Sequence, residues 1–169
     1  PYILSVATWE PRKNLELLLR TFLKLKQQGE ISKHTLVLVG GRGWKYSRIA
    51  KYIEGNDFII PIGYVPDDQL PALYAGADLF VFPSIYEGFG MPVLEAIACG
   101  TKVVASDIPE LREAGGEDAI YITPTMDGLY SGILKALSKE NTKEEGNKNR
   151  LPSWDSSAAI LASALSTSK

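Results

Sequence analysis

Residues 79–99 have the sequence LFVFPSIYEGFGMPVLEAIAC, and the rest of the chain can be arranged around them. The apolar run Leu79–Phe82 indicates a buried strand, and the end of the stretch is typical of a helix. Between them, Gly88 and Gly90 allow the backbone to approach a ligand closely and to adopt conformations closed to other residues, and Pro92 suits the first turn of a helix. Free amides at such a helix start point toward any anion placed there. The stretch is therefore predicted to be a strand-to-helix turn with an anion site.

Two carboxylates flank this turn. Glu87 precedes the glycines and Glu95 lies inside the predicted helix, with seven residues between them. A carboxylate beside a phosphate would repel it, so both acids are more consistent with accepting hydrogen bonds from hydroxyl groups on either side of an anion. The alternative is two solvent-facing acids, which leaves their occurrence together with the glycines and the proline unexplained. A ligand with hydroxyls, a diphosphate and further hydroxyls fits this turn, and a nucleotide sugar has that form.

The size and charge of the chain limit the classes of function. Its 169 residues, 45% hydrophobic and 22% charged, suit one globular domain. A net charge of −2 and a pI near 5.5 give no global attraction to nucleic acid or to an anionic membrane.

Cys99 is the single cysteine, which excludes an internal disulfide and a zinc cluster. No signal peptide or transmembrane run is visible, and a strand without an initiator Met begins the chain, so we expect a fragment of a longer protein.

Apolar runs alternate with helical patterns along the chain. Strands are predicted at 2–6, 35–39, 58–60, 79–82, 103–105 and 120–122, and helices at 15–28, 44–52, 67–76, 91–99, 109–113 and 127–137. Strands that are apolar throughout and alternate with helices indicate a mainly parallel sheet. We therefore predict an α/β, Rossmann-like doubly wound fold, with a six-stranded sheet covered by helices on both faces. Such sheets bind ligands beyond the carboxyl ends of their strands.

Some local features of this fold are also predicted. Asn14 suits the cap of the first helix, and Asp67 or Asp68 suits the cap of the third. Pro61 is expected to bend or break the third strand.

The last part of the chain differs in composition from residues 1–138, which form the predicted domain. Residues 139–152 are polar, with charges of both signs, and predict a linker or mobile loop. Residues 153–169 include Trp154, Leu161 and Leu165 at helical spacing and predict a final helix that packs outside the sheet.

Other polar residues follow the predicted strands. Arg12 and Lys13 come after the first strand, where a planar fork and a point charge could neutralise a diphosphate, although a solvated pair at a helix start remains the alternative. Gly40 begins a glycine-rich turn that is best explained as a strand exit, with backbone contacts to a ligand left open. Asp107 and Glu110 suit either the same cleft or the start of a helix.

Several motifs together resemble one enzyme family, in order and in spacing. They are Glu87–Glu95 with its Glu-x7-Glu pattern, Glu10–Asn14, Leu36–Gly40, Gly63–Pro66, Ala77–Ser84 and Ala105–Glu110. The chain is similar over about residues 2–137 to the retaining GT-B glycosyltransferases of group 1. The resemblance implies the C-terminal, donor-binding half of such an enzyme, with the N-terminal acceptor domain absent and residues 153–169 as the crossover helix.

The resemblance also implies roles for individual residues. Lys13 and Arg12 would bind the diphosphate and, with Glu87 at the donor-sugar hydroxyls, form the catalytic set. Glu95 would accept hydrogen bonds from the ribose diol, and Val65 would touch the base. The remaining expected donor contacts are Gly88, Phe89, Gly90, Met91, Leu94 and Gly40. Many relatives carry Gly-Arg where this chain has Ala7-Thr8, so Arg12 is expected to replace that missing cation.

The implied reaction is hexosyl transfer from a nucleoside diphosphate sugar to a hydroxyl acceptor, with retention, in polysaccharide biosynthesis. The donor would be a UDP-, GDP- or ADP-hexose, with no further cofactor and no metal, and the chain alone would bind it without turnover. The expected location is the cytoplasm, with visits to the inner membrane face. A sugar-nucleotide epimerase of the same architecture and a non-catalytic nucleotide-binding module remain open as alternatives.

Overall fold

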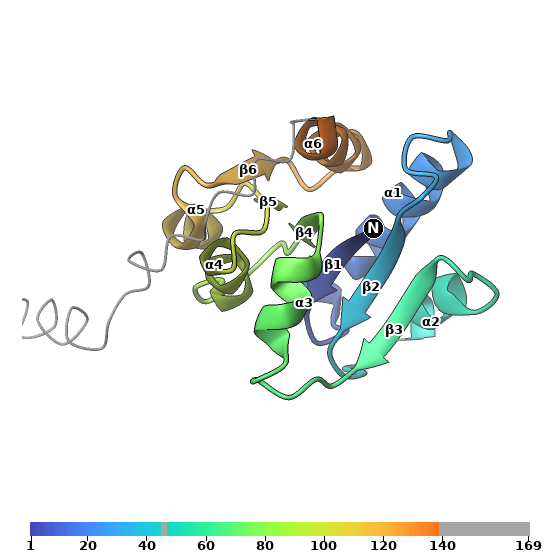
Figure 1. Cartoon of the computed structure of the whole chain (residues 1–169), viewed down its shortest axis with the longest axis horizontal. Coiled ribbons are helices and arrows are strands. Elements are labelled where there is room, and N and C mark those ends of the chain that lie inside the picture. The colour runs from blue at the N-terminus through green and yellow to red at the C-terminus, as the bar shows by residue number, and fades with distance from the viewer. Residues whose placement is uncertain (45–46, 139–169) are drawn as a thin grey trace, which may run out of the picture.

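A computed structural model of the chain describes residues 1–44 and 47–138. Its centre is a sheet of six parallel strands in the order β3-β2-β1-β4-β5-β6 (Figure 1). The strands are β1 (Tyr2–Val6), β2 (Thr35–Val39), β3 (Ile59–Gly63), β4 (Leu79–Phe82), β5 (Val103–Ser106) and β6 (Ala119–Ile122). This order is that of a doubly wound Rossmann-like sheet, so the predicted fold is confirmed.

Helices cover both faces of the sheet. They are α1 (Leu15–Gln27), α2 (Ser47–Ile53), α3 (Leu70–Gly76), α4 (Met91–Ala98), α5 (Pro109–Gly115) and α6 (Met126–Ser138), and a short 3-10 helix, η1 (Pro11–Lys13), precedes α1. One hydrophobic core lies between the sheet and α1, α2 and α6. A second core lies under α3, α4 and α5. The connections after β1 and after β4 therefore leave toward opposite faces.

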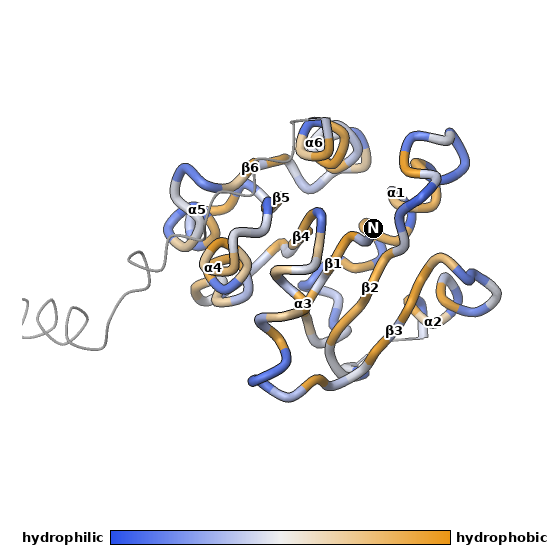
Figure 2. Tube along the Cα trace, in the orientation of Figure 1, coloured by the Kyte–Doolittle hydropathy of each residue, from blue (hydrophilic) through white to orange (hydrophobic). Residues whose placement is uncertain are grey.

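The strands form the core because their residues are apolar on both faces. All four residues of β4 and all four of β5 are buried, and the strands follow the hydrophobic parts of the trace in Figure 2. β1 lies between β2 and β4, with Ile3 opposite both Leu36 and Leu79. Strands β1 to β3 are added toward one edge of the sheet and strands β4 to β6 toward the other. The pair β1 and β4 is therefore the switch point of the sheet.

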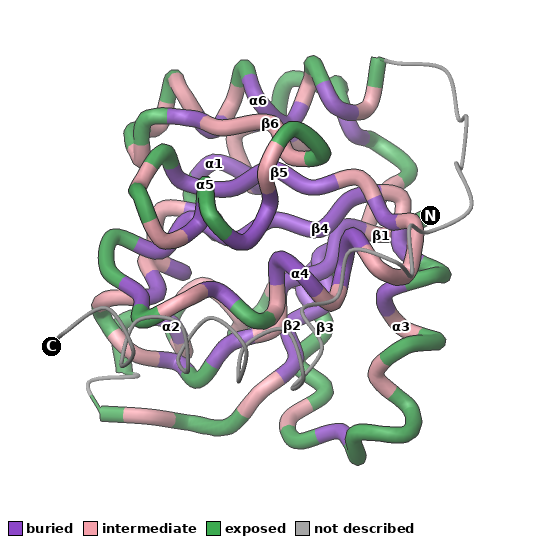
Figure 3. Tube along the Cα trace, turned by 90° about the vertical axis from the view of Figure 1, so that its left-hand side faces the viewer, coloured by how far each residue is buried: buried purple, intermediate pink, exposed green. Residues whose placement is uncertain are grey.

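The third strand does not break at Pro61. β3 continues through the proline to Gly63, with Pro61 opposite Leu38 and a shift of register directly afterwards. Of the two outcomes expected at Pro61, a bend or a break, the break does not occur, because β3 is an edge strand where a missing amide hydrogen costs little, and the shift of register is the local irregularity at the proline. The position also leaves β3 poorly covered: Ile60 and Ile62 are 43% and 45% exposed, and the chain around β3 contrasts with the buried centre in Figure 3.

Of the predicted helix caps, Asn14 is confirmed by its position but makes no side-chain hydrogen bond, and neither Asp67 nor Asp68 is a cap. Asn14 occupies the position before α1, but it is in the left-handed region at φ 54° and its side chain makes no capping hydrogen bond. Gln69, not Asp67 or Asp68, directly precedes α3, and it makes no side-chain cap either. Both helices are instead held by the apolar faces that they bury, such as Leu15 and Tyr74.

The predicted linker at 139–152 and helix at 153–169 lie outside the described residues. Within residues 1–44 and 47–138, none of the helices has the length and apolar character needed to cross a membrane.

Candidate functional site

The candidate site lies at the switch point, where the loops after β1 and β4 meet at the carboxyl ends of neighbouring strands. The loop after β1 turns into η1, which carries Arg12 and Lys13. The Ile85 amide in the loop after β4 donates to the Arg12 carbonyl at 2.9 Å. This backbone contact fixes the two loops to each other and brings Glu87 beside the two cations.

Glu87 is the centre of a chain of charges. Lys13 Nζ lies 2.6 Å from Glu87 Oε1, and Arg12 Nη1 lies 3.1 Å from Glu87 Oε2. Arg12 Nε also contacts Glu10 Oε2 at 2.9 Å. Glu87 and Lys13 are buried, at 7% and 8% exposure, whereas Arg12 is partly open to solvent. Each buried charge is thus compensated by a partner of opposite sign, as burial requires.

The two cations keep donor groups beyond those that Glu87 uses. A lysine ammonium has three N–H donors and an arginine guanidinium has five, so the recorded contacts leave several of them unused. An anion could bind on the open side of Arg12, next to the buried Lys13, without displacing Glu87. The sequence predicted separate contacts for Glu87 and for the cations, and the structure brings all three into one cluster.

The glycine turn leads directly into α4. Gly90 is the residue before the helix, with φ 99°, and no side chain caps the first amides of α4. Pro92 has no amide hydrogen and the Val93 amide donates to the Gly90 carbonyl at 2.9 Å, so the Met91 amide is the one in this first turn that is left to an external acceptor. A Cβ at Gly90 would lie 2.5 Å from Leu111 Cδ2 on α5, whereas one at Gly88 would meet nothing within 4 Å. Only Gly90 of the pair has a positive φ, so the expected special conformation applies to Gly90 and not to Gly88.

Glu95 lies further along α4 and has a partner that the sequence analysis missed. The Tyr74 hydroxyl on α3 donates to Glu95 Oε2 at 2.9 Å. Tyr74 is 1% exposed, and burial, followed by the charge of Glu95, raises the pKa of its hydroxyl far above the usual value. The hydroxyl therefore stays protonated. The sequence signal for Tyr74 was only its place in a short helix, which does not reveal the residue it faces.

An aromatic row, Tyr74–Phe80–Phe82, connects the surroundings of the two glutamates. The ring centroids of Tyr74 and Phe80 are 5.3 Å apart in an edge-on arrangement, and those of Phe80 and Phe82 are 5.8 Å apart and stacked. Lys13 Nζ lies 5.0 Å from the centre of the Phe82 ring. The row thus begins at Tyr74, the partner of Glu95, and ends at Phe82, which contacts Lys13, the partner of Glu87.

The other residues predicted to contact the donor differ in how far they are exposed. Gly40 has φ 123°, its amide donates to the Gly63 carbonyl at 2.7 Å, and a side chain there would collide with the backbone of Ala7. Val65 and Leu94 have buried side chains, Phe89 is half-buried and Met91 is exposed. The structure therefore explains Gly40 by close packing of two loops.

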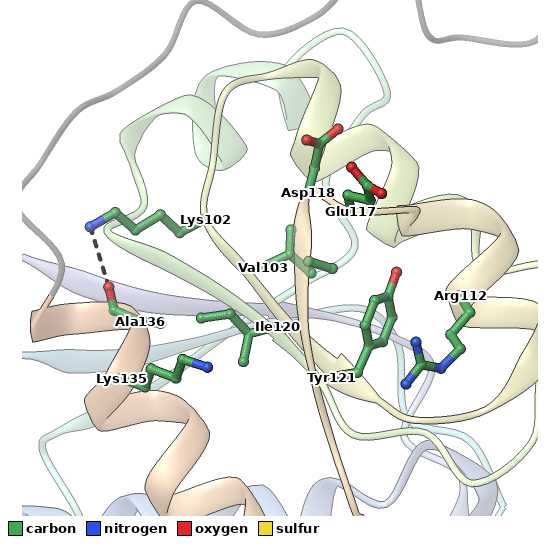
Figure 4. A pocket seen from close by; sticks show the side chains of 10 residues that line it. Lys102, Val103, Arg112, Glu117, Asp118, Ile120, Tyr121, Lys135 and Ala136 are labelled. Carbon is green, nitrogen blue, oxygen red and sulfur yellow. Dashed lines mark hydrogen bonds between the residues drawn. The ribbon is translucent and has the colours of Figure 1, made fainter.

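Cavities occur on both ends of the sheet. A cavity of about 410 Å³ is lined by Glu10, Pro11 and Asn14 together with the start of α2, and one of about 280 Å³ includes Gly40 and Gly63. A cavity of about 520 Å³ lies at β6 (Figure 4), and its lining includes none of the predicted site residues. There, Lys102 Nζ donates to the Ala136 carbonyl at 3.2 Å. Over the described part of the chain, no group of three or more His, Cys, Asp or Glu residues is placed to hold a metal ion.

The fold defines a Rossmann-like α/β domain of the GT-B type, with the candidate site at its switch point. The chain belongs to the family described as "Glycosyl transferases group 1", whose model matches residues 1–150.

Relatives and a solved structure agree with this assignment. The chain is 39% identical over 147 residues to O-antigen chain mannosyltransferase B of Escherichia coli, covering 85% of this chain and 38% of the relative. It is 30% identical over 140 residues to O-antigen chain mannosyltransferase RfbU of Salmonella typhimurium, covering 82% and 38%. The structure of sucrose-phosphate synthase from Thermosynechococcus elongatus superposes with a TM-score of 0.78 at 25% identity, over 99% of this chain and 45% of that one.

Proposed function

We propose that the chain binds a nucleoside diphosphate sugar at the turn Glu87–Glu95 and supplies the donor half of a retaining hexosyltransferase. The observation that carries this proposal is the cluster of Arg12, Lys13 and Glu87 beside the uncapped start of α4. The chain spans 38% of the length of each of the two mannosyltransferases compared above, so the acceptor and the complete reaction belong to the proposal as well. The names of those relatives favour a mannosyl unit and a polysaccharide product.

The chemistry follows from the charges at the turn. The bond between the sugar C1 and the diphosphate oxygen breaks, the acceptor oxygen bonds to C1 on the same face, and the acceptor proton ends on the diphosphate or in water. Negative charge grows on the leaving diphosphate, where Lys13, Arg12 and the amide at the start of α4 would stabilise it. A sugar hydroxyl would share Glu87 with the two cations, and Glu95 would accept from the ribose diol.

A binding experiment tests the site. Calorimetric titration of the chain with UDP, GDP and ADP, and with their hexose conjugates, should show one preferred nucleotide. Lys13→Ala and Glu95→Ala should each weaken its binding by about 10- to 150-fold, as expected for the loss of a charge-assisted hydrogen bond. Lys135→Ala is the control, because Lys135 is exposed on α6 and lines the cavity at β6. Unchanged affinity in both site variants would disprove the placement.

A second experiment tests the reaction. The intact protein in which this chain occurs should convert labelled nucleotide sugar and a hydroxyl acceptor into a glycoside. An interconverted nucleotide sugar without a glycoside would contradict the proposal and indicate an epimerase instead.

A further inference from the structure

We propose that Tyr74 is a positioning residue that holds the Glu95 carboxylate in the orientation needed to bind the ribose diol. This inference rests on the proposed nucleotide site and extends it to a residue outside the family motif. The two residues come from different helices, α3 and α4, and their contact is the 2.9 Å hydrogen bond from the Tyr74 hydroxyl to Glu95 Oε2.

Tyr74 is itself fixed from several sides. Its ring lies edge-on to Phe80 on β4, at 5.3 Å between centroids. Its carbonyl accepts a hydrogen bond from Thr101 Oγ1 at 2.6 Å and another from the Ala77 amide at 3.0 Å. The residue is 1% exposed, so its side chain has no space in which to change rotamer. The hydroxyl is therefore a rigid donor that can define the position of a more mobile acceptor.

The direction of the hydrogen bond is also fixed. Burial raises the pKa of Tyr74, and the neighbouring Glu95 charge raises it further, so the hydroxyl donates and the carboxylate accepts. Within the described residues, Tyr74 is the recorded partner of Glu95 and Oε1 accepts no hydrogen bond. One carboxylate oxygen is thus held by the protein, and the other is left for a hydroxyl of a ligand.

This arrangement has a consequence for affinity. A glutamate on a helix surface loses rotamer freedom when it binds a ligand, and that entropy opposes binding. Tyr74 restricts Glu95 before the nucleotide arrives, so less freedom is lost on binding. The benefit depends on the ribose hydroxyls, because only they are expected to contact Glu95.

The test removes the tyrosine hydroxyl and the ribose hydroxyls separately. The probes are the tightest-binding of UDP, GDP and ADP, together with its 2′-deoxy and 3′-deoxy analogues, titrated calorimetrically. Tyr74→Phe should weaken binding of the ribonucleotide by about three- to tenfold, as expected for one hydrogen bond. It should leave the affinity for at least one deoxy analogue at its wild-type value. A purely structural role for Tyr74 would weaken all of the probes equally, and that result would overturn the inference.

Tyr121→Phe is the matched control. The Tyr121 hydroxyl is also a hydrogen-bond donor, but its acceptors are the main-chain carbonyls of Leu111 and Gly116, and its residue lies on β6. This variant should keep the wild-type ratio of ribonucleotide to deoxynucleotide affinity. If it lowers that ratio as much as Tyr74→Phe does, the effect is not specific to Glu95 and the inference fails.

Glu95 variants separate this inference from the proposed site. If Glu95→Ala weakens ribonucleotide binding and Tyr74→Phe does not, the site stands and the role of Tyr74 is refuted. If Glu95→Ala also has no effect, the ribose assignment and the Tyr74 inference both fail. Should Tyr74→Phe not fold, Glu95→Asp gives a second test, because its shorter side chain withdraws the carboxylate from Tyr74. Undiminished ribose discrimination in Glu95→Asp would then overturn the inference.

Discussion

At the scale of single residues, the Lys13–Glu87 pair contributes both to the stability of the fold and to the proposed binding of the donor. The residues are 8% and 7% exposed, and desolvation of both charges is offset only while they remain paired. Arg12 adds a second cation from a position that solvent reaches, so its contribution to stability is expected to be smaller. The pair therefore fixes the loop after β1 against the loop after β4 even without a ligand.

Lys13→Met should lower the free energy of unfolding by about 1 to 3 kcal/mol, because Glu87 keeps only the partly exposed Arg12 as a partner. Adding Glu87→Gln to Lys13→Met should restore part of that loss, since the unpaired buried charge is then removed. Urea unfolding of both variants measures the difference. Arg12→Met serves as the control and should cost about 1 kcal/mol or less. A double variant that is less stable than Lys13→Met would contradict this account of the pair.

At the scale of elements, the start of α4 depends on one of its two glycines. Gly90 needs its positive φ of 99°, and α5 packs so closely that a Cβ there would meet Leu111 at 2.5 Å. Gly90→Ala should therefore lower the free energy of unfolding by about 2 kcal/mol. Gly88→Ala should change it by less than about 0.5 kcal/mol, because the added methyl group meets open space. Equal losses in the two variants, measured by urea unfolding, would refute this distinction.

The same element shows what the sequence could predict. Apolar strands such as Leu79–Phe82 and the grouping of glycines, proline and glutamates predicted the sheet and the turn, because these are local patterns. Which glycine is constrained depends on Leu111, which comes from another helix. The contact of Tyr74 with Glu95 likewise depends on how α3 and α4 pack, and the continuation of β3 through Pro61 depends on its edge position. Tertiary neighbours decided these features, and no local pattern reports them.

At the scale of the whole molecule, the protection of backbone amides from hydrogen exchange should decrease from the centre of the sheet to its edge at β3. Leu4 and Phe80 are register partners in β1 and β4, both 0% exposed, and helices cover them. Ile60 and Ile62 on β3 are 43% and 45% exposed. Amide hydrogen exchange should therefore be slowest for Leu4 and Phe80, near the rate set by global unfolding, and faster for Ile60 and Ile62. Similar protection of both pairs would show that β3 is covered in solution.

The adjacency of β1 and β4 also affects how the molecule is made. The Lys13–Glu87 contact joins residues that are 74 apart in the sequence. Glu87 follows β4, and β4 is the strand that pairs with the second edge of β1. At a synthesis rate of about 5 to 20 residues per second, roughly 4 to 15 s pass between the appearance of Lys13 and that of Glu87. During that interval the edge of β1 that pairs with β4 has no partner strand. A nascent chain of this protein is therefore most open to misassembly, and most in need of a chaperone, before β4 emerges.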